Sequence, residues 1–172
     1  MQFLRNNLRI SSTLKRMMRY GILGRYIPDF GSIIGHMQYD LFHIYTVDEH
    51  SLRMVQMLRR YRYPEEKEVF PISCELIHKI SRKEVLYITA ILHDAGKMHK
   101  GEHEIAGAES AKEFCKQHNI NKYDSDLIEW LIRNHLLMSH ASQRIDINNP
   151  EDVHQFALEV GDIEYLNHLF LV

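Results

Sequence analysis

The sequence predicts an all-α fold, and three features of the chain indicate it. Apolar residues recur at three- and four-residue steps through most of the chain, as they do on the buried side of a helix. Helix start signals precede some of these stretches, as in Thr46-Val47-Asp48-Glu49 and Asn149-Pro150-Glu151-Asp152. No stretch keeps the alternation of apolar and polar residues that is typical of a β-strand. We therefore expect a single helical bundle, without internal repeats or low-complexity segments.

Composition limits the classes of function. The 172 residues are 45% hydrophobic, enough to bury roughly 70% of the surface of the unfolded chain in one core. With 21 basic and 23 acidic residues the net charge is -2, so we expect no nucleic-acid partner. Cys74 and Cys115 lack disulfide or zinc-finger spacing, and no signal peptide or bilayer-long apolar run is visible. We therefore expect a cytoplasmic protein without a membrane partner.

The first forty residues predict a helical arm that packs on the core. A helical pattern with interspersed Arg and Lys comes first and is closed by Gly21 and Gly24. Short helical pieces joined by turns are expected next, around Pro28, Gly31 and Gly35. We predict an arm over residues 1–40 and a core domain over residues 41–172.

The stretch from Val85 to Lys97 predicts the buried centre of the domain. Its apolar residues cover nearly the whole circumference of a helix, and the stretch runs directly into His93 and Asp94. These residues are Val85, Leu86, Ile88, Ala90, Ile91 and Leu92. Burying a histidine and a carboxylate costs several kcal/mol unless each has a partner. At a helix end, hydrogen bonds to the backbone would be enough to give both residues partners. A divalent ion such as Mn, Fe, Zn or Mg, rather than Ca, would satisfy both residues at once.

Three more histidines are predicted to point inward from other helices. His50 follows the start signal at Thr46 and lies on an apolar stripe with Val47, Met54, Met57 and Tyr61. His103 begins a helix that is expected to end near His118, and His135 continues the stripe of a helix capped by Asp124 or Ser125. A single inward histidine is more often a hydrogen-bonded core residue than a ligand. Several on facing helices, together with a His-Asp pair, favour a metal site.

The remaining segments carry no visible chemistry. A short amphipathic helix is expected from Ile72 to Ile80, and a polar, turn-rich segment from Ser139 to Asn149. After it, Asn149 and Pro150 are predicted to start a final helix or helix pair.

One set of residues resembles the motif of the HD superfamily of metal-dependent phosphohydrolases. The set consists of His50, the pair His93-Asp94 and Lys97, which follows the pair. Longer motifs are similar to those of bifunctional uridylyltransferase/uridylyl-removing enzymes, and the likeness runs from about Leu14 to the end of the chain. These motifs are Asp40-Leu-Phe-His-Ile-Tyr-Thr-Val-Asp-Glu-His50, His103-x-x-x-Gly-Ala-Glu, and His135-Leu-Leu-Met-Ser139 followed by Arg144-x-Asp146.

The resemblance implies a specific reaction and a set of site residues. The reaction is metal-dependent hydrolysis of the phosphodiester that joins UMP to a tyrosine of the PII nitrogen-regulatory protein, in its uridylylated form. His50, His93 and Asp94 would hold one divalent ion, and Asp94 would bridge to a second ion held by His103 and His135. His93, Asp94 and Lys97 would be the catalytic residues. Lys97 would stabilise charge on the phosphoryl oxygens, although an ordinary surface lysine at a helix end explains this residue equally well.

The resemblance also identifies what this chain lacks. The nucleotidyltransferase motif, Gly-Ser-x-x-Arg with a following Asp-x-Asp, is absent, so the nucleotidyltransferase and ACT domains of a parent chain are expected as partners. The family's last metal-binding aspartate would follow Val172, and the 41–172 domain would then be truncated at its C-terminus. Alternatively, Asp162 would take the place of that aspartate. Two alternatives remain open: an HD phosphohydrolase acting on free nucleotides, and a non-catalytic regulatory HD module.

Overall fold

The computed structural model describes residue 4 and residues 9–37, 45–98 and 103–172, and these form helices without any strand, as predicted. The predicted domain boundary at residue 40 and the first residues of the Asp40–His50 stretch lie outside this part of the chain. The helices are α2 (Ile10–Arg19), α3 (Ile22–Tyr26), α4 (Pro28–Ser32), α5 (Val47–Arg60), α6 (Pro71–Lys79), α7 (Lys83–Leu92), α8 (His103–Gln117), α9 (Lys122–Arg133), α10 (Leu137–Arg144), α11 (Pro150–Val160) and α12 (Ile163–Leu169), with the 3-10 turns η1 (Pro64–Glu66) and η2 (Ala95–Met98).

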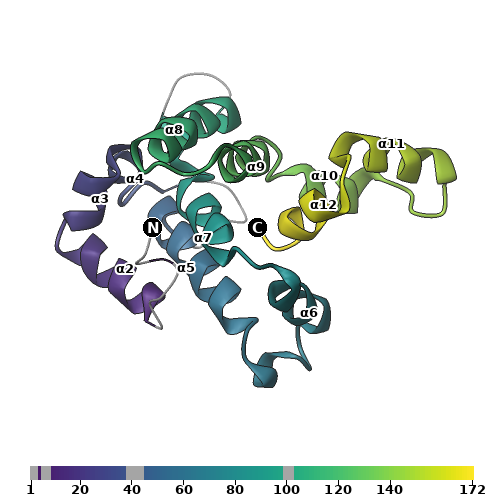
Figure 1. Cartoon of the computed structure of the whole chain (residues 1–172), viewed down its shortest axis with the longest axis horizontal. Coiled ribbons are helices and arrows are strands. Elements are labelled where there is room, and N and C mark those ends of the chain that lie inside the picture. The colour runs from purple at the N-terminus through teal and green to yellow at the C-terminus, as the bar shows by residue number, and fades with distance from the viewer. Residues whose placement is uncertain (1–3, 5–8, 38–44, 99–102) are drawn as a thin grey trace.

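Helix α7 is the centre of the bundle. Every residue from Glu84 to Leu92 is buried, because α5 packs on one side of α7, whereas α8 and α9 pack on another side (Figure 1). A helix that is apolar around its whole circumference needs such an enclosure. The hydroxyl of its one buried threonine, Thr89, donates to the carbonyl oxygen of Val85 at 3.0 Å. The predicted buried centre is thus present, and it ends at the His-Asp pair.

The N-terminal helices cover the bundle on the α5 side. Helix α2 packs on α5 through buried Ile10 and Leu14, and α4 packs on α7 and η2 (Figure 1). Gly21 separates α2 from α3 with φ of 68°, a left-handed conformation that favours glycine. The expected short helical pieces are therefore seen over the described part of this region.

Helices α10 and α11 extend away from the α5–α9 bundle (Figure 1). Helix α12 packs on α9, whereas α11 buries only Val160 of its eleven residues. The segment predicted to be turn-rich from Ser139 contains most of α10, so that prediction was wrong in part. Helix α10 buries no residue, and its polar composition reflects exposure to solvent rather than a lack of helix.

The helix starts are mostly where the sequence predicted them, although two caps differ. Helix α5 begins at Val47, but the side chain of Thr46 makes no capping hydrogen bond. Helix α9 is capped by Asn121, whose Oδ1 accepts from the Asp124 amide at 3.0 Å, rather than by Asp124 or Ser125. Asp124 is instead buried and its carboxylate lies 2.5 Å from Arg82. The cap of α11 at Asn149 is confirmed, with Oδ1 accepting from the Glu151 amide at 3.1 Å.

Each of the described helices is too short or too polar to cross a membrane.

Candidate metal centre

The His-Asp pair lies at the point where α7 changes to the 3-10 turn η2. His93 is the C-cap of α7, and Ala95 begins η2 directly after Asp94. Both members of the pair are only 2% exposed. An ionised carboxylate at this depth needs charged or hydrogen-bonding partners to offset its lost hydration.

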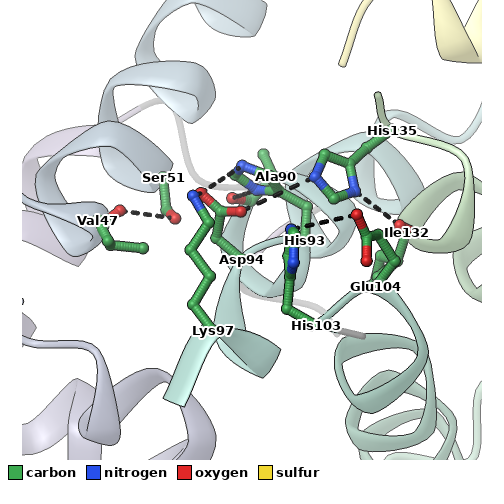
Figure 2. Close-up of polar contacts among 10 residues, drawn as sticks. All are labelled: Val47, Ser51, Ala90, His93, Asp94, Lys97, His103, Glu104, Ile132 and His135. Atoms are coloured by element: carbon green, nitrogen blue, oxygen red, sulfur yellow. Dashed lines mark hydrogen bonds and ion pairs between the residues drawn. The ribbon is translucent and has the colours of Figure 1, made fainter. Parts of the chain in front are cut away.

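Asp94 has such partners at both of its oxygens. Its Oδ2 lies 2.9 Å from Lys97 Nζ and 3.3 Å from His93 Nε2, and its Oδ1 lies 3.8 Å from His135 Nε2 (Figure 2). Burial alone would raise the pKa of Asp94. His93 and Lys97 oppose burial more strongly, so the net pKa of this carboxyl lies well below its usual range. Asp94 therefore remains an anion.

Backbone hydrogen bonds orient two of the imidazole rings. His93 Nδ1 lies 3.0 Å from the Ala90 carbonyl oxygen, and His135 Nδ1 lies 2.7 Å from the Ile132 carbonyl oxygen (Figure 2). A carbonyl only accepts, so each Nδ1 carries a proton and donates, which turns each Nε2 toward Asp94. The two explanations offered by the sequence, a backbone bond or a metal site, are thus compatible for His93.

His135 is held in its neutral form. Burial is the main cause that lowers its pKa, to about 4, and the neighbouring charge of His93 adds to the effect. Neutral imidazole is the form that binds a metal ion, because the ligand nitrogen must be free of a proton. At neutral pH the 3.8 Å approach to Asp94 is therefore not an ion pair.

The described residues contain two groups whose ligand atoms all lie within 4.8 Å of one another, and both groups include Asp94. His50 and His93 belong to the first, with ring centroids 5.4 Å apart, and His103 and His135 to the second, with centroids 5.9 Å apart. Figure 2 shows the side chains of Asp94, His93, His103 and His135 turned toward one another. The five predicted ligands therefore converge from α5, the turn that follows α7, the start of α8 and the segment that follows α9.

Two of the predicted positions differ in detail. The deepest side chains of α5 are Ser51, Leu52, Val55 and Leu58, so the stripe through His50, Met54 and Met57 borders the core instead of facing it. His50 is consequently half-buried, at the solvent side of the site.

Asp162, the alternative last ligand, is exposed and belongs to neither group. Its Oδ1 accepts from the Glu164 amide at 2.6 Å, which makes it the cap of α12.

Two glycines bring the His-Asp turn against α8. A Cβ on Gly96 would collide with the carbonyl oxygen of His103 and lie 2.5 Å from the amide nitrogen of Gly107. A Cβ on Gly107 would lie 3.4 Å from the carbonyl oxygen of His93. In the sequence, Gly107 stands out only as the glycine of the His103-x-x-x-Gly-Ala-Glu motif. The sequence gave no reason to single out Gly96, because the need for a glycine there arises only from its contact with α8.

The donor set fits a divalent transition-metal ion. Each group offers two imidazole nitrogens and one carboxylate oxygen, a mixture typical of Mn, Fe or Zn sites rather than the oxygen-only sites of Ca. The buried anionic Asp94 and the backbone bonds of His93 and His135 are the supporting contacts that metal ligands usually have.

Comparison with known families agrees with this geometry. The sequence model of the HD domain family matches residues 47–168, which include both ligand groups. The chain belongs to the HD domain family. The family resemblance inferred from the His93-Asp94 motif and the all-α fold are thereby confirmed.

Several curated relatives of this HD domain are bifunctional uridylyltransferase/uridylyl-removing enzymes. The one from Nitrosococcus oceani is 46% identical over 172 residues, which are 100% of this chain and 19% of the relative. Those from Azotobacter vinelandii and Ectopseudomonas mendocina are 47% and 46% identical over 163 residues, 95% of this chain and 18% of each relative. The chain thus spans about a fifth of the length of these relatives.

Proposed function

We propose that this HD domain is a metal-dependent phosphodiester hydrolase that removes UMP from a tyrosine of the uridylylated PII nitrogen-regulatory protein. The observation that carries the proposal is the pair of ligand groups that share buried Asp94. The relatives' name, uridylyl-removing enzyme, supports the substrate. On the same ground, the partners within a parent chain would be nucleotidyltransferase and ACT domains.

The residues that would hold metal follow from the two groups. His50, His93 and Asp94 would hold one ion, and Asp94, His103 and His135 a second. A divalent ion supplies Lewis acidity, which lowers the pKa of water toward neutrality and offsets charge on phosphoryl oxygens.

Two side chains of the site, those of Asp94 and Lys97, would provide the charges that the reaction needs. Asp94 stays ionised because His93 and Lys97 lower its pKa. The Lys97 side chain is 15% exposed, so its ammonium group lies at the edge of the site, where it would offset negative charge on a phosphoryl group. In the overall reaction a water oxygen bonds to phosphorus, the bond from phosphorus to the tyrosine oxygen breaks, and the tyrosine oxygen takes up a proton. The products are UMP and unmodified tyrosine.

The test is to incubate the metal-loaded chain with uridylylated PII and, separately, with a panel of free nucleotides. We expect Mn²⁺-dependent release of UMP from PII. Asp94→Ala should reduce the rate by several orders of magnitude, because Asp94 serves both groups, and His135→Ala should reduce it less if one ion suffices. His154→Ala, at an exposed position of α11, is the matched control.

Three outcomes would contradict the proposal. Hydrolysis of a free nucleotide without UMP release from PII would favour a nucleotide phosphohydrolase. Metal binding without hydrolysis of any substrate would favour a regulatory module. Full activity of Asp94→Ala would exclude the metal centre as the catalytic site.

A further inference from the structure

A second candidate site lies at the other end of α5 from His50. A hollow of about 270 Å³ is lined there by three arginines, two serines, a glutamine and a tyrosine. We call it the arginine hollow, formed by Arg9, Ser11, Ser12, Arg59 and Arg60. It lies between the first turn of α2 and the last turn of α5, two helices that pack together (Figure 1). Nine residues of helix separate Arg59 from His50, about 14 Å along the axis.

The lining of the arginine hollow carries positive charge only. A guanidinium group keeps its proton at any physiological pH, and no aspartate or glutamate is among the described residues that line the hollow. Glu66, beside the hollow, accepts from Nε and Nη2 of Arg60 at 2.8 Å each. Arg9 and Arg59 also interact within the chain. The inference therefore rests on the concentration of charge and not on an unpaired guanidinium.

The chemistry of the arginine hollow suits a phosphate group. Arg59 is only 9% exposed, whereas Arg9 and Arg60 are exposed. Planar guanidinium groups bind phosphate oxygens through paired N–H donors, and the hydroxyl group of Ser11 adds a single donor. The hydroxyl of Ser12 already donates to the carbonyl oxygen of Arg9 at 2.9 Å. A volume of about 270 Å³ leaves room for a phosphate group.

We propose that the arginine hollow is a binding site for a phosphate group, either free or carried by a nucleotide. The site lies apart from the metal centre, and none of its lining residues is one of the five predicted ligands. The proposal does not depend on the hydrolytic function, so each can fail without the other.

The test is an NMR titration of the metal-free, ¹⁵N-labelled chain with inorganic phosphate at low ionic strength, followed by UMP and AMP. We expect shift changes at the amides of Ser11, Ser12 and Gln56. Arg9→Gln should weaken phosphate binding by about tenfold, the usual order for one charged hydrogen-bonding group. Arg19→Gln makes the same charge change at the far end of α2 and should leave the affinity unchanged.

Further arms of the titration identify the ligand and guard against misfolding. Arg59→Gln removes the buried arginine, and its affinity is interpreted only if the amide spectrum of the variant remains that of the folded chain. Arg9→Gln changes an exposed residue, so it tests the proposal even if Arg59→Gln fails to fold. Tighter binding of UMP or AMP than of inorganic phosphate would identify a nucleotide, and equal affinity would identify the phosphate group alone.

Three results would overturn the proposal. The first is the absence of shift changes at millimolar phosphate. The second is an equal loss of affinity in Arg19→Gln, which would indicate unspecific attraction to a basic surface. The third is a set of changes confined to the amides around His93 and His135, which would place the anion at the metal centre.

Discussion

At the scale of single residues, Asp94 links the two halves of the candidate metal centre. Its Oδ2 faces His93 and Lys97, and its Oδ1 faces His135, so one carboxylate is shared between two ligand groups. Because Asp94 is 2% exposed, its negative charge is only weakly screened by water and acts strongly on its neighbours. The nearby cation Lys97 offsets that charge in the chain as described, and a bound divalent ion would share this task.

The position of Lys97 leads to a prediction that separates binding from catalysis. Lys97→Met removes a positive charge 2.9 Å from Asp94, so repulsion of an incoming cation falls and Mn²⁺ should bind at least as tightly as to the unmodified chain. Release of UMP from PII should nevertheless slow by about 10²-fold, the usual effect of losing one group that stabilises phosphoryl charge. The measurements are the Mn²⁺ dissociation constant by calorimetry and kcat for UMP release.

Lys97→Arg is the control for that prediction, since it keeps the charge and should recover part of the rate. A parallel loss of Mn²⁺ affinity and rate in Lys97→Met would instead mean that Lys97 holds Asp94 in place and makes no contribution of its own to the reaction.

His135 leads to a prediction about pH and the stability of the metal-free chain. Its pKa is about 4 in the folded chain and about 6.5 when unfolded, so between these values the unfolded state binds more protons. The free energy of unfolding should therefore fall as pH drops from 6.5 to 4, by roughly 3 kcal/mol from this residue. Urea unfolding of the unmodified chain and of His135→Gln, at several pH values, measures the difference. His168 also has a lowered pKa but is present in both proteins, so its effect cancels. Equal slopes for the two proteins would show that His135 does not titrate in this way.

At the scale of elements, the metal centre depends on close packing between η2 and α8. Gly96 in η2 meets the first turn of α8 at His103, and Gly107 in α8 meets the carbonyl of His93. The His-Asp turn and the helix that carries His103 are therefore held together by direct backbone approach. A side chain on Gly96 would push the His-Asp turn away from His103.

Substitution of these two glycines should have unequal effects. The Cβ of Gly96→Ala would overlap the His103 carbonyl, which is backbone and cannot rotate away, so we expect a loss of roughly 3 kcal/mol in the free energy of unfolding and weaker Mn²⁺ binding. The closest atom to a Cβ at Gly107 is the Ile132 methyl group, at 3.3 Å, which can move. Alanine also gains about 1 kcal/mol over glycine within a helix, so Gly107→Ala should stay within about 1 kcal/mol of the unmodified chain. Urea unfolding and Mn²⁺ titration of both variants are the measurements, and similar losses in the two would contradict the packing argument.

The elements also show what could be predicted from the sequence. Helices α5 and α9 were predictable because burial on one side imposes three- and four-residue steps on their sequences, and α7 was predictable because it is apolar on all sides. Helix α10 was missed because no residue of it is buried, so no such steps appear. The convergence of His50, His93, Asp94, His103 and His135 was predicted from their inward positions and the family motifs. Gly96 and the arginine hollow were not, because both depend on which distant segments meet.

At the scale of the whole molecule, the metal centre joins elements that are far apart in the sequence. Its predicted ligands come from α5, the end of α7, the start of α8 and the end of α9, and these elements form most of the bundle around α7 (Figure 1). The ligands come together only when the chain is folded. A bound ion would therefore bind the folded state in preference to the unfolded state and stabilise the bundle as a whole.

This linkage gives a prediction for the melting temperature. At Mn²⁺ one hundred times above its dissociation constant, the folded state gains about 2.7 kcal/mol, which for a chain of this size raises Tm by about 5 to 11 °C. A chelator should reverse the rise. In Asp94→Asn the rise should disappear, because the shared anionic ligand is lost from both groups, whereas exposed His154→Ala should keep it. Thermal unfolding followed by circular dichroism, with and without Mn²⁺, measures all three proteins. An equal rise in Asp94→Asn would mean that Mn²⁺ binds through other histidines of the chain, and the two groups around Asp94 would then not be the metal centre.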